Sequence, residues 1–166
     1  LGDSVTVGVP SLGFDLSNWG LPAGAGTPAA DFYRNLLADQ LADEFGLLAP
    51  ASGWSLVDVI NGTSLLQSSN DFSSCAKWGA RNDDLLLPPH VQLEACLPPE
   101  TRNEATLVVM TSGSNDLASL TQAAIAGAGA VELMAQAQEI VDLMEEAIVW
   151  LKDPSRFTAP VYVVFA

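Results

Sequence analysis

The stretch "ATLVVMTSG", residues 105–113, decides the fold that the sequence predicts. It is a continuous apolar run of strand length, and such runs are typical of parallel strands that are buried on both faces of a sheet. The polar residues "SND" follow at once, at positions 114–116. Because ligands bind beyond the carboxyl ends of the strands in open parallel sheets, this stretch predicts a central strand with a site beside it.

The segment before this strand carries signals for helices and one more strand. "GTPAADFYRNLLADQLADEFG", residues 26–46, predicts a helix that Thr27 caps, with Pro28 in its first turn and Gly46 at its end. Residues 47–67 predict a short buried strand, a turn at Ser52 and Gly53, and a second helix. Apolar side chains at helical spacing give the inward faces of the two helices: Phe32, Leu36, Leu37, Leu41 and Phe45 in the first, and Val57, Ile60 and Leu65 in the second.

The segment after the strand predicts a long helical region over residues 117–152 and a final buried strand over residues 159–166. Gly127 and Gly129 are expected to break the helical region into two pieces, and Pro154 is expected to stop it. The inner stripe is formed by Leu133, Ala137, Ile140, Met144, Ile148 and Leu151.

The alternation of strands and helices predicts an α/β protein with helices on both faces of the sheet. We expect a three-layer α/β/α sandwich, flavodoxin-like, with a mostly parallel sheet. Residues 1–166 are expected to form a single domain, with an excursion or cap at about residues 68–104 that contains one helical piece. Because the chain starts inside an expected element and stops on a bare strand, we expect this domain to be truncated at both ends.

The amino-acid composition excludes some classes of binding partner. The chain is 49% hydrophobic, with 20 acidic and 6 basic residues and a net charge of −14. This charge repels phosphate backbones, so nucleic acid is not an expected partner. No apolar run reaches the roughly 18 residues that a membrane-spanning helix needs, so the chain is not expected to be an integral membrane protein.

Two cysteines, Cys75 and Cys96, flank a polar stretch. They are expected to form a disulfide, which would indicate a secreted or extracytoplasmic protein; two free thiols are the alternative. Their spacing lacks the paired Cys-x-x-Cys pattern of a zinc site, and no metal or other cofactor is expected.

Three turns are expected at carboxyl ends of strands: "GDS" at residues 2–4, "ASG" at residues 51–53 and "SGSND" at residues 112–116. They bring together a serine, backbone N–H groups beside glycines, and an asparagine amide. A serine on a tight turn is a candidate nucleophile, and these N–H groups are the donors that an oxyanion needs. The combination predicts acyl transfer.

These blocks resemble those of the SGNH (GDSL-type) esterases and lipases over essentially the whole chain. The resemblance implies that Ser4 is the nucleophile and that its own N–H, the N–H of Gly53 and the side chain of Asn115 form the oxyanion hole. Gly62 is a substitute for Gly53 in this role. Supporting positions are implied for Asp3, which stabilises the turn, for Gly113, which allows close approach, and for Asp116, whose simpler role is to cap the following helix.

The family's general base is a histidine in a late Asp-x-x-His motif, which these 166 residues lack. His90 is the sole histidine and is expected to be a loop or cap residue. The predicted function of the intact protein is hydrolysis of a carboxylic ester of a small molecule or a lipid, without a cofactor, and the fragment itself is expected to be inactive. The alternatives are a non-catalytic binding or scaffold protein, a carbohydrate acetylesterase on the same fold, and a phosphate-binding domain, which the absent Gly-rich loops disfavour.

Overall fold

The computed structural model describes residues 1–3, 6, 33–50, 57–58, 63–64 and 68–165. These residues belong to two compact units, one made of Leu1 with Ala80–Ala166 and the other of Gly2–Gly79. Both units mix helices or turns with short strands, and the sheets include one parallel and two antiparallel pairs among the described residues. The general α/β character that the sequence predicts is therefore present.

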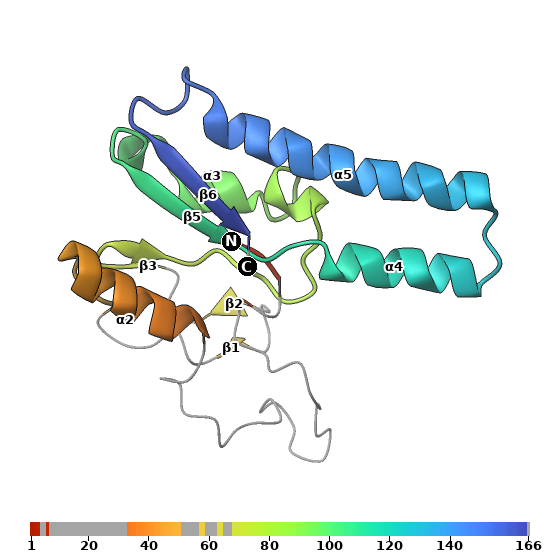
Figure 1. Ribbon diagram of the computed structural model, residues 1–166, viewed down its shortest axis with the longest axis horizontal. Coiled ribbons are helices and arrows are strands. Elements are labelled where there is room, and N and C mark those ends of the chain that lie inside the picture. Colours follow the sequence, from red (N-terminus) through yellow and green to blue (C-terminus); the bar gives the residue numbers. More distant parts are fainter. Residues whose placement is uncertain (4–5, 7–32, 51–56, 59–62, 65–67, 166) are drawn as a thin grey trace, which may run out of the picture. The chain divides into compact units, whose positions relative to one another are not determined.

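The unit of Leu1 and Ala80–Ala166 is built on two parallel strands. β5 (Thr106–Met110) pairs in parallel with β6 (Val161–Phe165), and the register runs from Thr106 opposite Val161 to Met110 opposite Phe165. Two helices connect the strands, α4 (Ser114–Ile125) and α5 (Ala130–Lys152), and α5 runs along the strand pair (Figure 1). The predicted strand–helix–strand crossover is confirmed.

The break between α4 and α5 falls at the predicted glycines. Gly127 has a φ of +91°, a left-handed conformation that L-residues with a side chain rarely adopt, and Gly129 is the N-cap of α5. Helix α5 ends at Lys152, two residues before Pro154. Its predicted inner stripe is confirmed as a less exposed face, on which Leu151 is fully buried.

The connection from α5 to β6 is a tight turn at Asp153. The hydroxyl and the backbone N–H of Ser155 donate hydrogen bonds to Asp153 Oδ1, at 2.7 and 2.8 Å. These bonds, together with the nearby Arg156 guanidinium, lower the pKa of the partly exposed Asp153 carboxyl below its ordinary value.

The prediction that the central strand is buried on both faces is wrong for the described residues. On one face, Val108 and Met110 are buried. On the other face, Leu107 is 45% exposed and its register partner Tyr162 is 59% exposed. A parallel pair normally needs a helix layer on each side. Helix α5 covers one side of this pair, and the alternation of exposure along β5 and β6 follows from it.

Residues 80–102 form part of the core of this unit, whereas an excursion from the core was expected. They contain the 3-10 turns η2 (Asp83–Leu85) and η3 (Pro99–Thr101) and the helix α3 (Gln92–Cys96), which is the expected helical piece. Leu85 and Leu93 are fully buried. The sequence does not reveal that these residues belong to the core. Only one fully buried leucine lies in η2 and one in α3, and the residues around them are polar or proline.

A buried arginine joins this core to α5. Arg102 donates from Nε to the carbonyl of Leu97 at 2.7 Å and from Nη2 to Glu94 Oε2 at 2.5 Å. Its guanidinium carbon lies 4.9 Å from the ring centroid of Trp150 and 5.6 Å from that of Phe157. Hydrogen bonds together with cation–π contacts compensate the burial of this charge.

The unit of Gly2–Gly79 contains α2 (Tyr33–Phe45) and two short antiparallel hairpins. β1 (Val57–Asp58) pairs with β2 (Thr63–Ser64), and β3 (Ser68–Ser69) pairs with β4 (Phe72–Ser73). The helix predicted through Val57 and Leu65 is therefore wrong at β1 and β2. Residues 57–58 and 63–64 are extended and pair with each other, which excludes a helix at these positions, whereas Ile60 and Leu65 lie outside the described residues.

The buried strand predicted at residues 47–50 is also wrong. Leu48 is 65% exposed, and no strand is assigned there. The turn between β3 and β4 satisfies the backbone of this segment instead. Leu48 N–H donates to Asp71 Oδ2 at 2.7 Å, and Asn70 Nδ2 donates to the carbonyl of Ala49 at 2.6 Å. The backbone N–H of Asp71 also donates to the carbonyl of Leu48, at 3.5 Å. Two side chains and one turn amide thus bind the backbone groups that a neighbouring strand would otherwise pair.

Helix α2 ends as predicted but buries a different face. Gly46, with a φ of +66°, follows its last residue. The predicted apolar face fails because Leu36 and Phe45 are exposed, Phe45 by 68%. The buried side chains are those of Arg34, Asn35, Ala38 and Ala42. Small alanines permit close packing, and the Arg34 guanidinium donates from Nη1 to the carbonyl of Thr6 at 2.8 Å. The predicted cap at Thr27 and Pro28 lies outside the described residues.

Cys75 and Cys96 are both disulfide-bonded, and the predicted bridge is confirmed. In the described part of the chain, no helix combines the length and apolar character required to cross a bilayer.

We expect the double variant Cys75→Ser/Cys96→Ser to lose about 3 kcal/mol of unfolding free energy, because the bridge closes a loop of about 20 residues in the unfolded chain. Urea denaturation measures this loss. Dithiothreitol should lower the melting temperature of the parent protein and leave that of the double variant unchanged. An equal melting temperature of the parent protein with and without the reductant would contradict the prediction.

Candidate functional site

The predicted site loop Ser112–Asp116 follows β5 directly and leads into α4. Gly113 is the N-cap of α4 and has a φ of +98°, so a residue with a side chain would be strained there. A Cβ atom at Gly113 would lie 3.7 Å from Asn82 Oδ1, which is an ordinary contact. The glycine is therefore required by the backbone turn, and its supporting role differs from the close approach that the sequence predicted.

Asn115 is held by one of its two amide N–H groups. Its Nδ2 donates to the carbonyl of Ala80 at 2.8 Å, and the side chain is half-buried. An asparagine amide nitrogen carries two hydrogens. The second N–H has no hydrogen-bond partner among the residues that the structure describes. A fixed amide with one unused donor has the chemistry that oxyanion binding requires.

Asp116 binds the segment 81–82 and does not cap helix α4. It lies in the first turn of α4, whose N-cap is Gly113. Its side chain is fully buried and accepts hydrogen bonds from the backbone N–H of Asn82 at 3.0 Å and from Arg81 Nε at 3.3 Å. The capping interpretation is wrong because this carboxylate turns toward residues 81 and 82.

Asn82 was not singled out from the sequence, although it contacts the same loop. It is 3% exposed, its Oδ1 accepts from Ser112 Oγ at 2.6 Å, and its Nδ2 donates to the carbonyl of Ile140 at 2.9 Å. Residues 80–82 thus bind Ser112, Asn115 and Asp116. The polar run "GARNDD" at residues 79–84 was the available signal, but its placement in an expected excursion concealed it.

Leu1 occupies a strand position beside the carboxyl end of β5. Its amino group donates to the carbonyl of Val109 at 3.1 Å, and its carbonyl accepts from the N–H of Thr111 at 3.3 Å. Val109 and Thr111 flank Met110. In a parallel ladder, one residue bonds in this way to the two neighbours of the residue opposite it. Leu1 therefore pairs with β5 in parallel.

The other predicted site residues belong to the second unit. Asp3 is buried, with 1% of its surface exposed, as expected for a residue that supports a turn. The carbonyl of Gly2 accepts from the N–H of Lys77 at 3.0 Å. Ser4, Gly53 and Gly62 lie outside the described residues, so their predicted roles stay predictions.

His90 lies in a turn between η2 and α3, as a loop histidine should. Its Nε2 is 3.6 Å from Asp84 Oδ1, and both side chains are partly buried. The pair forms a salt bridge when the imidazole is protonated.

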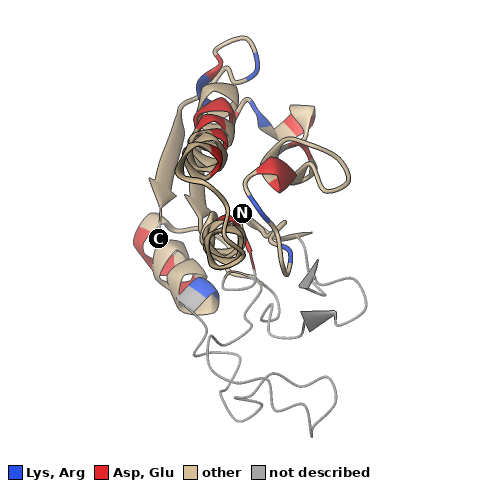
Figure 2. Cartoon of the chain, turned by 90° about the vertical axis from the view of Figure 1, so that its right-hand side faces the viewer, with Lys and Arg blue, Asp and Glu red and all other residues tan. Residues whose placement is uncertain are grey.

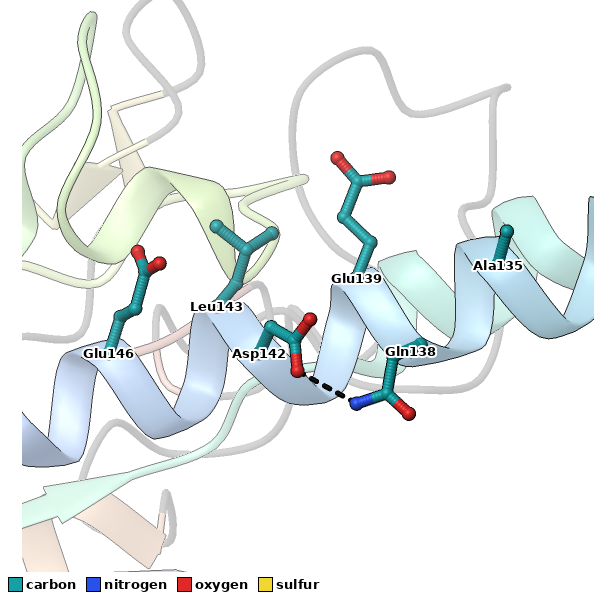
Figure 3. A pocket seen from close by; sticks show the side chains of 6 residues that line it. All are labelled: Ala135, Gln138, Glu139, Asp142, Leu143 and Glu146. Atoms are coloured by element: carbon teal, nitrogen blue, oxygen red, sulfur yellow. Dashed lines mark hydrogen bonds between the residues drawn. The ribbon is translucent and has the colours of Figure 1, made fainter.

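The surface depressions of the described residues lie elsewhere. One of about 510 Å³ is lined by six side chains of α5, and its only internal contact in Figure 3 is the bond from Gln138 Nε2 to Asp142 Oδ1, 2.7 Å long. A second, of about 520 Å³, lies over Val149, Trp150 and Arg156. In the cartoon of Figure 2, the positions of Asp and Glu are coloured red, and several of them lie along α5. Neither depression contains a predicted site residue, and the described residues hold no cluster of three potential metal ligands.

Comparison with known proteins gives no relatives: no family model, no curated protein and no solved structure matches this chain.

Proposed function

We propose that the full-length protein is a serine hydrolase of carboxylic esters, of the kind that the SGNH resemblance implies. The observation that carries the proposal is the parallel pairing of Leu1 with β5. Ser4 follows Leu1 by three residues, a reach of at most about 11 Å, and the loop Ser112–Asp116 follows β5. The proposal is that the Gly-Asp-Ser sequence and this loop follow neighbouring parallel strand positions, which is how parallel sheets build active sites.

In the proposed reaction, Ser4 Oγ attacks the acyl carbon and transfers its proton to a general base. The oxyanion that forms accepts hydrogen bonds from the N–H of Ser4 and from the unused N–H of Asn115. The alcohol leaves with the proton, and water then attacks the acyl-enzyme to release the acid and restore Ser4. No metal or organic cofactor takes part in this scheme.

A backbone N–H completes the proposed oxyanion hole. Gly53 is the candidate from the sequence, with Gly62 as its substitute. The general base is proposed to be a histidine oriented by an aspartate, both outside these 166 residues. The wider fold is proposed to be a three-layer α/β/α sandwich, which the parallel β5–β6 pair and its covered face support.

A fluorophosphonate probe tests this proposal directly. The Ser4 oxygen should bond to the phosphorus of the probe, with loss of fluoride and the hydroxyl proton, and the peptide that contains Ser4 should gain the corresponding mass. We expect labelling of the folded full-length protein and none after denaturation. Labelling of a different serine would contradict the assignment of Ser4 as the nucleophile, and labelling of none would contradict the proposal and favour a binding or scaffold protein.

A further inference from the structure

We propose that Asn82 is a positioning residue of the ester-hydrolase site, which orients Asn115 through the loop Ser112–Asp116. This inference rests on the proposed function. It concerns a residue that does not touch the substrate and acts through its hydrogen bonds to the loop.

The side chain of Asn82 has both of its polar atoms engaged, and they bond to different parts of the fold. Its Oδ1 accepts from Ser112 Oγ at 2.6 Å, and its Nδ2 donates to the carbonyl of Ile140, in the middle of α5, at 2.9 Å. The backbone N–H of Asn82 donates to the buried Asp116 at 3.0 Å. Asn82 therefore links the loop to the rigid helix α5.

The residues that Asn82 contacts lie on both sides of Asn115 along the chain. Ser112 precedes Asn115 by three residues and Asp116 follows it, and both bond to Asn82. The amide of Asn115 itself bonds to Ala80, two residues before Asn82. The short segment 80–82 thus fixes the start of the loop, its end and the amide between them. A catalytic donor must be held to within about 0.5 Å of its productive position, which such a shell of contacts achieves.

Only an amide at position 82 satisfies both neighbours. Ser112 donates its hydroxyl to this side chain, whereas the carbonyl of Ile140 accepts from it. Aspartate at this position would accept from Ser112 but would place a carboxylate oxygen against the Ile140 carbonyl. Alanine would remove both bonds and leave the hydroxyl of Ser112 without its acceptor, next to a residue that is only 3% exposed, and the loss of a partner for such a group is costly.

The test measures ester hydrolysis by the full-length protein with Asn82→Ala, and with Ser112→Ala as a milder variant that removes only one hydrogen bond. We expect kcat to fall roughly 10- to 100-fold in Asn82→Ala and up to about tenfold in Ser112→Ala, with KM within about twofold of the parent value, because misplacement of a catalytic group acts on the chemical step. Asn103→Ala, at an exposed position, is the matched control and should leave kcat unchanged.

The decisive measurement combines Asn82→Ala with Asn115→Ala. If Asn82 acts through Asn115, the double variant should be no slower than Asn115→Ala by more than about twofold. Multiplied losses in the double variant, or a parent-like kcat in Asn82→Ala, would overturn the positioning role while Ser4→Ala and Asn115→Ala still showed the proposed function. Full activity in Ser4→Ala and Asn115→Ala would overturn both. If Asn82→Ala does not fold, Ser112→Ala replaces it in the same cycle.

Discussion

Replacing Ser4 by alanine in the full-length protein is expected to reduce kcat/KM for carboxylic esters by roughly 10³-fold or more. The methyl group of alanine cannot form the acyl-enzyme, so only the remaining oxyanion donors and substrate binding can contribute to hydrolysis. Initial rates with a series of p-nitrophenyl esters of increasing chain length measure the effect and define the acyl preference at the same time.

The control for this variant is Ser155→Ala, which changes an exposed serine in the turn after α5. It removes the Oγ bond to Asp153 and should leave ester hydrolysis at the parent rate. Circular dichroism should show the same spectrum for both variants. Retention of the parent kcat/KM by a folded Ser4→Ala variant would refute the nucleophile and with it the proposed function.

Asn115→Ala is expected to lower kcat by about 10²- to 10³-fold, the usual effect of removing one oxyanion donor. The geometry makes a second substitution informative. Asn115→Asp preserves the size of the side chain but places carboxylate oxygens where one N–H bonds to Ala80 and the other is proposed to meet the oxyanion. It should be at least as inactive as Asn115→Ala, because the negative charge opposes the developing oxyanion.

A pre-steady-state measurement separates this role from substrate binding. For an ester whose acylation is rate-limiting, the acylation rate should fall by the full factor and KM should change by less than about threefold. A variant Asn115→Ala that raises KM at unchanged kcat would show that the amide binds the ground state only, and the assignment to the oxyanion hole would be wrong.

The sequence predicted the parts of the fold that depend on local signals. β5 and β6 each contain five residues that carry no charge and are mostly aliphatic or aromatic, and they pair in parallel as expected. The end of α2 at Gly46 and the break at Gly127 were predictable because both glycines adopt positive φ angles that other residues avoid.

The errors lie where tertiary contacts override local pattern. At Leu48 and Ala49, hydrogen bonds from Asn70 and Asp71 in the β3–β4 turn take the place of a pairing strand, and nothing near Leu48 in the sequence indicates them. In α2, helical spacing identifies an apolar stripe, yet the buried face of the helix is a different one, which contains the small residues Ala38 and Ala42. Periodicity alone cannot distinguish a face that packs closely from one that is merely apolar.

The candidate site was predictable in part for the same reason. The residue types of Ser112–Asp116 announce a turn with polar donors at the end of a strand. The partners of this loop, Ala80 and Asn82, lie about 30 residues away in the chain and bond partly through backbone atoms, which leave no mark on residue type. The contacts of Ala80 and Asn82 with the loop are therefore evident only from the three-dimensional structure.

The linkage of Asn82 to Ile140 also orders events in folding. The hydrogen bond joins residues 58 positions apart, and the bond from Asn82 to Asp116 joins residues 34 apart. Contacts of such long sequence separation form late, since the loop-closure entropy must be overcome first. During synthesis from the N-terminus, the segment 80–82 and the site loop leave the ribosome before α5 can meet them. The contacts that orient the amide of Asn115 are thus complete only after α5 has packed against the segment 80–82. The site can therefore form only when the unit of Ala80–Ala166 has folded.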